Sequence, residues 1–425
     1  MKEGFDVVKV GPNTKNVVIW GTVVLSFVLA LTQRLSVGAV AEDLVREFGY
    51  SGSQLGLITS AAMYAYAIMQ VPAGFMVDSL GVRNVCGFGL IMTALGSLLF
   101  AISPNIGLAI ASRVLIGVGT SGMMLSVFKL QTELFDPGQF SALSGIVTCC
   151  GNVGVLLAMS PFAILVSRMG WRETFYLLSA VTFALAIVTF VIVPKGEVAE
   201  RMSGRSMLNA FKKVIFNPRT WAPFGVLFTV MGIITTLNGL WGIPYVTHVY
   251  GVDKVYASKL LSAIPIGFIV GGLLLGRVCT AFKGDVRKVM ISGSTLLALV
   301  MAFIVICGGK PPAGMLPVVF FVMGLAGVIH ILAFTKCKEV NPPELSGVAS
   351  GVVNMGEFIG SSIFGQVFGY VLDRKWDGTV VDGARAYNVS GYGSMFIISA
   401  VVALGSIFCC FKQTRNKNMD EEVSV

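Results

Sequence analysis

One acidic residue, Glu357, lies in the middle of a long apolar stretch, at residues 346–372. A run of that length can cross a bilayer as a helix, and a charged carboxylate at its centre costs about 2.5–3.5 kcal/mol on insertion scales. Asn354 and Ser361 lie three and four residues away, on the same helix face. We expect this face to point at a central cavity, where Glu357 carries a proton or pairs with a cationic ligand. The alternative is a structural acid, protonated or salt-bridged.

A second polar group lies in the apolar run 222–248, where Asn238, Trp241 and Tyr245 are interspersed with glycine and proline. Glycine and proline loosen a membrane helix, so we expect an interruption here, with freed carbonyls and these side chains forming a gate beside the cavity. The alternative is that the aromatic residues are ordinary anchors at the membrane interface.

Other polar residues inside apolar runs are weaker cavity candidates, namely Tyr64, Tyr66 and Asn152. His330 is one of only two histidines, and we expect it to have a hydrogen-bonded structural role rather than to transfer protons. The sequence contains no nucleophile–base pair and no cluster of metal-ligating residues. We therefore expect neither an enzyme nor a cofactor or metal site.

The amino-acid composition indicates that the chain is surrounded by lipid rather than water. Hydrophobic residues make up 55% of the 425 residues and charged residues only 12%, where a soluble domain carries about 25%. So little charge cannot cover a chain of this length in water, and the apolar surface must face lipid. The net charge of +9 could suggest nucleic acid, but the basic residues lie in short gaps between apolar runs rather than along one face.

The apolar runs come in two sets of six, each run long enough for a membrane helix and too long for a barrel strand. We expect an all-α membrane protein. The spans are 17–38, 54–76, 84–103, 107–130, 141–167 and 173–194, then 222–248, 257–281, 287–308, 314–335, 346–372 and 391–411.

The gap between the two sets predicts two domains. Residues 195–221 form the longest polar stretch between helices, so we expect a cytoplasmic linker between an N-terminal bundle, 1–194, and a C-terminal bundle, 222–412. With both termini in the cytoplasm, most basic loop residues face the cytoplasm, as the positive-inside rule requires. We expect a disordered cytoplasmic tail at 413–425 and a monomer in the cell (inner) membrane.

The short gap between the second and third runs carries a motif, G-x-x-x-D-x-x-G-x-R, at Gly74, Asp78, Gly81 and Arg83. Gly74 permits close helix packing, Gly81 permits a sharp turn, and Asp78 can pair with Arg83 or face a helix N-terminus. The motif resembles the signature loop of the major facilitator superfamily, although Ser79 stands where that family usually has a basic residue. The resemblance implies that the loop gates one transport state by contacting the eleventh helix.

The fourth run adds Arg113 in an R-x-x-x-G-x-G pattern, which is also similar to that superfamily and places Arg113 with the gating residues. The resemblance implies twelve transmembrane helices in two pseudo-symmetric six-helix bundles, with a substrate site between them.

The stretch from Arg34 to Gly56, followed by residues 60–72, resembles the anion:cation symporter branch of that superfamily. The resemblance implies that Arg34 binds the carboxylate of an organic anion, for which a guanidinium fork is suited. Arg34 is also close enough to the helix end to reach the lipid headgroups instead. Two acids typical of the branch are replaced here, by Gln33 and Thr120, so the inherited proton site is missing.

These observations lead to the hypothesis of a secondary active transporter of a small organic anion, such as a carboxylate or sugar acid, in symport with H⁺ by alternating access. Arg34 would bind the anion and Glu357 would couple the proton. One alternative is an exporter of a cationic or zwitterionic metabolite, with Glu357 attracting the cargo. Another is a transporter-like sensor that binds a ligand without moving it.

Overall fold

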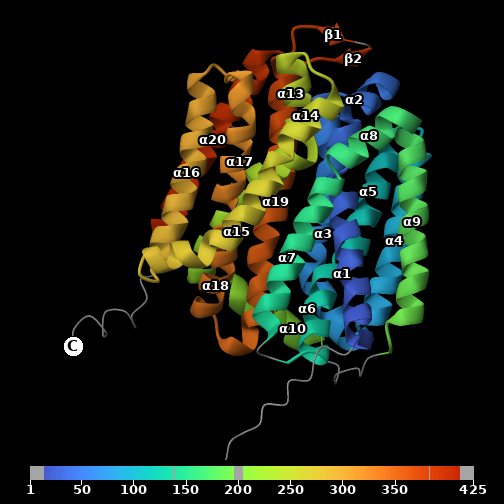
Figure 1. Ribbon diagram of the computed structural model, residues 1–425, viewed down its shortest axis with the longest axis vertical. Helices are drawn as coiled ribbons and strands as arrows, with labels where there is room; N and C mark the ends of the chain where they lie inside the picture. The colour runs from blue at the N-terminus through green and yellow to red at the C-terminus, as the bar shows by residue number, and fades with distance from the viewer. Residues whose placement is uncertain (1–13, 137–138, 196–203, 382, 412–425) are drawn as a thin grey trace, which may run out of the picture.

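The computed structural model describes residues 14–136, 139–195, 204–381 and 383–411, and within them the chain is almost entirely helical. The long helices lie roughly side by side, and the early and late parts of the chain form neighbouring halves (Figure 1). The predicted tail, 413–425, lies outside the described residues.

The first half contains six membrane-crossing rods, several of which are two helices in succession. Its helices are α1 (Thr14–Leu35), α2 (Val37–Phe48), α3 (Gly52–Leu80), α4 (Val82–Ala101), α5 (Ile106–Thr120), α6 (Met123–Leu134), α7 (Phe140–Leu157), α8 (Ser160–Met169) and α9 (Trp171–Ile192). The polar segment that follows holds α10 (Gly204–Ile215) and a 3₁₀ turn, η2 (Pro218–Thr220).

The second half repeats this arrangement. Its seventh rod is α11 (Trp221–Val226), η3 (Leu227–Met231), α12 (Gly232–Thr236), η4 (Leu237–Trp241) and α13 (Gly242–Tyr250). The others are α14 (Lys254–Leu261), α15 (Ala263–Ala281), α16 (Val286–Ile306), η5 (Ala313–Met315), α17 (Leu316–Gly327), α18 (His330–Val340), η6 (Pro343–Leu345), α19 (Ser346–Arg374) and α20 (Val389–Phe411). A two-residue hairpin, β1 (Val380–Val381) with β2 (Ala384–Arg385), precedes α20.

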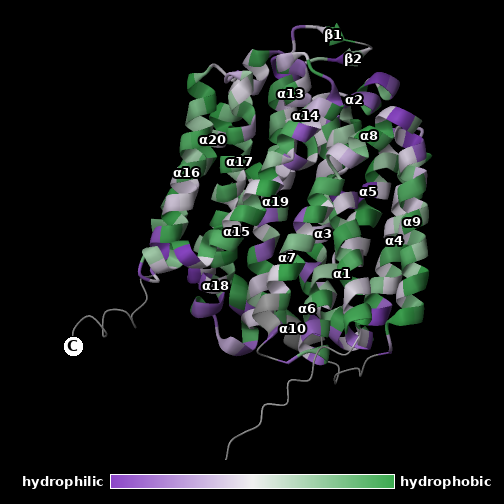
Figure 2. Ribbon diagram, in the orientation of Figure 1, coloured by the Kyte–Doolittle hydropathy of each residue, from purple (hydrophilic) through white to green (hydrophobic). Residues whose placement is uncertain are grey.

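Among the described residues, 11 helical stretches are long and apolar enough to cross a membrane. The remaining rod, α19, is 29 residues long but carries polar residues along its length, including Asn354 and Glu357. Large apolar side chains such as Val191 (78% exposed) and Leu273 (73% exposed) project from the outer surface. Hydrophobic residues follow the lengths of the rods and hydrophilic ones gather at the two ends (Figure 2). The protein is therefore a twelve-helix membrane protein whose flanks face lipid.

Helix irregularities recur at matching positions of the two halves. The first rod is broken at Ser36, and the corresponding seventh rod contains two π-helical stretches, η3 and η4. Such irregular backbone at membrane depth is typical of functional sites in transporters. The sequence predicted an interruption of the seventh rod around Asn238. The rod instead stays helical there: the wider π-helical turn η4 leads directly into α13.

The two halves pack most closely along α3 and α19. A Cβ atom on Gly56 would lie 2.5 Å from the carbonyl oxygen of Gly365, and one on Gly369 would collide with the backbone of Gly52. Backbone atoms cannot move aside as a flexible side chain can. The lack of a side chain at Gly56 and Gly369 therefore permits α3 and α19 to pack with their backbones in contact.

Candidate functional site

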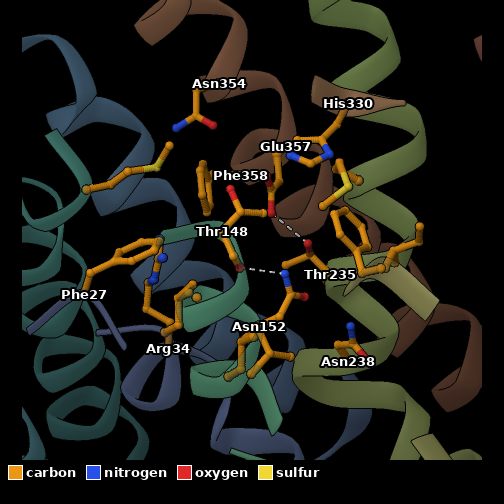
Figure 3. Close-up of a pocket in the computed structure, with 18 of the residues that line it drawn as sticks. Phe27, Arg34, Thr148, Asn152, Thr235, Asn238, His330, Asn354, Glu357 and Phe358 are labelled. Carbon is orange, nitrogen blue, oxygen red and sulfur yellow. Dashed lines mark hydrogen bonds between the residues drawn. The ribbon is translucent and has the colours of Figure 1, made fainter. Parts of the chain in front are cut away.

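A cavity of about 180 Å³ lies between the two halves. Its wall comes from α1, α3, α6 and α7 of the first half and from η3, α12, η4, α15, α18 and α19 of the second. Figure 3 shows Arg34, Thr148 and Asn152 on the first-half side, across from Thr235, Asn238, His330 and Glu357.

Arg34 lines this cavity and is only 3% exposed, so it does not reach toward the headgroups. Its guanidinium carbon lies 4.0 Å from the ring centre of Tyr66 and 5.2 Å from that of Phe358. Both rings can stabilise the cation through their π faces. Within the described part of the chain, the buried Nε and Nη1 atoms of Arg34 have no hydrogen-bond partner. Buried cationic donors of this kind favour an anionic ligand.

The backbone of Arg34 is held by a second arginine. Arg113 is fully buried and donates from Nη1 to the carbonyl of Gln33, at 2.9 Å, and from Nη2 to that of Arg34, at 2.7 Å. The helix break at Ser36 frees these carbonyls from helix hydrogen bonds, and Arg113 satisfies both, together with the Ser36 hydroxyl at Gln33. The structure thus places Arg113, which the sequence analysis grouped with the gating residues, against the backbone of Arg34 beside the cavity.

Gln33 and Thr120 stand where the anion:cation symporter branch typically has acids, and neither lines the cavity wall. The amide of Gln33 is buried between Ser97, whose hydroxyl donates to it at 2.5 Å, and Thr182, to which it donates at 2.8 Å. The hydroxyl of Thr120 bonds to the carbonyl of Ile116 in its own helix. Both residues therefore have structural roles in the first half.

Glu357 is the acidic residue among those that line the cavity. Its Oε1 accepts a hydrogen bond of 2.9 Å from the hydroxyl of Thr235. Among the described residues no ion pair within 4.0 Å joins Glu357 to Arg34, so each remains available to a ligand or a proton. One cation and one carboxyl group therefore line the same small cavity from different halves.

Of the other predicted cavity residues, Asn152, Asn238 and Asn354 also line the wall. The amide of Asn354 donates to Gln70 Oε1 at 3.1 Å, a bond between the halves. His330 lines the wall too, and its Nδ1 lies 3.1 Å from the carbonyl of Gly327.

Four residues predicted to bind substrate are not part of this wall. Tyr64 accepts a weak bond from Gln366, at 3.4 Å, where the halves touch. Trp241 and Tyr245 are almost fully buried and donate to the carbonyls of Gly365 and Gly309. Ser361 bonds within its own helix. In this structure these four side chains bond to the protein instead, because a polar residue in an apolar helix can serve helix packing equally well.

Tyr66, a weaker candidate from the sequence, lines the wall, as do Thr235 and Phe358, which the sequence analysis missed. Thr235 lies three residues before Asn238 and shares its helix face, a spacing that could have identified it. Phe358 gives no comparable signal, because a phenylalanine that lines a cavity looks in sequence like one that faces lipid.

Among the described residues, no hydrogen bond or ion pair joins Asp78 or Arg83 of the gating motif to α19. Asp78 is 68% exposed in its side chain and pairs with Lys129 of α6 at 2.8 Å. Arg83 donates to the carbonyl of Phe190 rather than to Asp78. Gly81 has a φ of +79°, a left-handed conformation that suits the turn. A Cβ on Gly74 would lie 3.9 Å from Leu125, so packing in this state does not require glycine there.

The opposite end of the α3–α19 pair is closed by a carboxylate that the sequence analysis did not single out. Asp373 accepts hydrogen bonds of 2.8 Å from the backbone N–H groups of Gly52 and Ser53, at the start of α3. The hydroxyls of Ser53 and Tyr387 donate to it as well, at 2.6 and 2.8 Å. Nearby, Lys254 of the second half pairs with Asp43 of the first at 2.7 Å. We call this region the Asp373 end, and the region of Asp78 the Asp78 end.

Comparison with known proteins agrees with this architecture. The chain is 22% identical to a probable sulfoacetate transporter of Cupriavidus necator over 89% of this chain and 93% of that protein. It is also 22% identical to a probable L-galactonate transporter of Escherichia coli, over 81% of each. A solved bacterial homologue of the human lysosomal transporter Spinster has a TM-score of 0.76 at 16% identity, covering 96% of this chain and 99% of that one. The nucleoside transporter NupG has a TM-score of 0.72 at 16% identity, covering 92% and 100%.

The sequence model of one family covers most of the chain. Residues 22–365 match the Major Facilitator Superfamily, which agrees with the two six-helix halves and the cavity between them. The chain belongs to the major facilitator superfamily and is a multi-pass membrane transporter.

Proposed function

We propose that the protein moves a small organic anion together with a proton, by alternating access. The observation that carries the proposal is Arg34, a buried cation on the cavity wall whose Nε and Nη1 have no hydrogen-bond partner among the described residues. A buried, unpaired charge is unfavourable, so an anion that pairs with it is bound strongly. The names of two relatives, a sulfoacetate and an L-galactonate transporter, agree with an anionic cargo.

Charge balance inside the cavity supports coupling to a proton. With Arg34 charged and Glu357 ionised, the empty wall carries no net charge, and a monovalent anion makes it negative. A proton on Glu357 restores neutrality, so anion and proton each favour the binding of the other. This thermodynamic linkage is what symport requires.

The proposed domains follow from the two halves. Residues 1–194 and 222–412 rock against each other around the cavity, joined by a linker at 195–221 that holds α10. By the positive-inside rule, the Asp78 end and both termini face the cytoplasm. The protein is a monomer in the inner membrane of the cell. The Asp373 end then faces outward, and the contacts across it correspond to a state closed on that side.

Uptake into proteoliposomes tests this function. A panel of radiolabelled carboxylates and sulfonates is offered with and without an inward proton gradient. We expect the gradient to drive accumulation of at least one anion by the wild-type protein. Glu357→Gln is expected to lose this gradient-driven accumulation while retaining exchange of labelled for unlabelled anion, because binding at Arg34 persists.

The matched control is Glu344→Gln, the same change at an exposed position just before α19. Glu344→Gln should accumulate anion like the wild type. Gradient-driven accumulation that survives Glu357→Gln would contradict the coupling role of Glu357. Absence of uptake for the whole panel would contradict an organic anion as cargo.

A second candidate is favoured by the presence of Arg34 and Glu357 on one wall. A zwitterion could place its anionic group at Arg34 and its cationic group at Glu357, with no proton needed, and could be exported. In that case Glu357→Gln abolishes binding of the cargo itself instead of only its coupling, and efflux from preloaded liposomes exceeds gradient-driven uptake.

A further inference from the structure

Most polar side chains on the cavity wall are already bonded within the protein. The amide of Asn152 donates to the carbonyl of Thr148 at 3.0 Å, and Thr235 donates to Glu357 at 2.9 Å. Asn354 bonds to Gln70. A ligand rich in hydroxyl groups would break these bonds or leave its own groups unsatisfied, which weakens its binding.

Among the buried side-chain atoms of the wall, those of two residues have no hydrogen-bond partner in the described part of the chain. The first is Arg34, with Nε and Nη1 unpartnered. The second is the side-chain oxygen of Asn238, which is buried and has no hydrogen-bond partner among the described residues. Arg34 and Asn238 come from α1 and η4, one in each half, and lie at opposite sides of the cavity in Figure 3. The wall thus offers a cation for an anionic group and, across from it, a hydrogen-bond acceptor that has no partner among the described residues.

Aromatic rings make up much of the remaining wall. Six ring-bearing residues contribute, namely Phe27, Tyr66, Phe128, Phe268, Phe334 and Phe358. The cavity volume of about 180 Å³ is close to that of the roughly 150 Å³ engineered cavity that holds one benzene molecule. Flat rings against apolar walls gain both buried area and favourable ring contacts.

We propose that the cargo is an aromatic monocarboxylate with one further hydrogen-bond donor, such as a hydroxybenzoate. Its carboxylate pairs with Arg34, its ring packs among the phenylalanines, and its hydroxyl donates to Asn238. This inference rests on the proposed function, since it takes Arg34 as the anion site. It departs from the sugar acid and the short sulfonate for which two relatives are named, because neither places a ring against this wall.

Calorimetric titration of the purified full chain tests the proposal with 4-hydroxybenzoate, benzoate and L-galactonate. We expect 4-hydroxybenzoate to bind about tenfold more tightly than benzoate, since one hydrogen bond to a buried acceptor is gained. L-Galactonate should bind at least about tenfold more weakly than benzoate, because several of its hydroxyls find no partner. Asn238→Ala should remove the preference for 4-hydroxybenzoate over benzoate.

The matched control is Asn84→Ala, since Asn84 lies outside the cavity wall and bonds to the carbonyl of Leu80. This variant should keep the preference. A preference that survives Asn238→Ala would overturn the role of Asn238. Binding and uptake of L-galactonate with none of either benzoate would overturn the aromatic cargo and leave organic-anion transport standing. Failure of every anion of the uptake panel would overturn both.

Discussion

The two ends of the α3–α19 pair differ in how the halves are held together. At the Asp373 end, Asp373 accepts four hydrogen bonds, three of them from Gly52 and Ser53 of the other half, and glycines allow backbone contact. At the Asp78 end, Asp78 is exposed and pairs within its own half. Both ends use the same device, a carboxylate close to a helix terminus, but only one is engaged across the halves. Under the proposed alternating access, a transport cycle would exchange one cap for the other.

The largest effect is expected from filling the glycine contact at the Asp373 end. Gly56→Trp places a large side chain where even a Cβ meets the carbonyl of Gly365 at 2.5 Å. The backbone cannot yield without separating α3 from α19, so closure of this end should fail and uptake should fall below about a tenth of wild type. Spin-label distances across the Asp373 end should lengthen. The control is Gly272→Trp, where an added Cβ meets nothing within 4 Å, and it should retain uptake.

An intermediate effect is expected from removing the charge of the cap. Asp373→Asn keeps the size of the side chain but weakens its bonds to the N–H groups that start α3. Loss of a charged cap costs about 1–2 kcal/mol, so the equilibrium constant for closure of this end should fall about fivefold to thirtyfold and the closed population should decrease. The same spin-label distances report that population. An unchanged distance distribution would show that glycine packing alone closes this end.

Asp377→Asn is the control for this charge. Asp377 lies four residues away, in the loop after α19, and bonds to Thr379 and Asn388 of the same loop. These hydrogen bonds, from Thr379 first and then Asn388, lower the pKa of Asp377 to about 2. Asp377 therefore stays ionised under any condition of a transport assay, and pH dependence of the closure does not originate from it. Asp377→Asn should leave the distances across the Asp373 end unchanged.

The smallest effect is expected at the Asp78 end. Lys129→Ala removes the ion pair with Asp78, whose side chain is 68% exposed. Exposed pairs contribute about 0–1 kcal/mol, so the melting temperature and the distances across both ends should change little. If the distances across the Asp78 end instead shorten in Lys129→Ala, Lys129 holds Asp78 away from α19, and the two ends differ because of this ion pair.

The twelve-helix fold could be predicted from the sequence because the cost of burying polar backbone and charge in lipid dictates long apolar runs. The same cost made Glu357 conspicuous, and the structure places it on the cavity wall with Arg34. Trp241 and Tyr245 could not be placed in this way, because helix rotation decides whether an aromatic residue meets a cavity, a neighbouring helix or lipid. Asp373 was missed because an acid at the end of a helix looks like an ordinary interface residue until its partner, 320 residues away in sequence, is known.

The guanidinium of Arg34 packs against two aromatic rings that belong to different halves of the protein. Tyr66 belongs to the same half as Arg34, whereas Phe358 belongs to the other, so only one of the two rings travels with the guanidinium when the halves rock. Withdrawal of Phe358 admits water to one face of the cation, and a hydrated cation holds an anion less tightly than a dry one. Affinity would then differ between the two sides of the membrane, and unloading would be a result of the rocking movement itself.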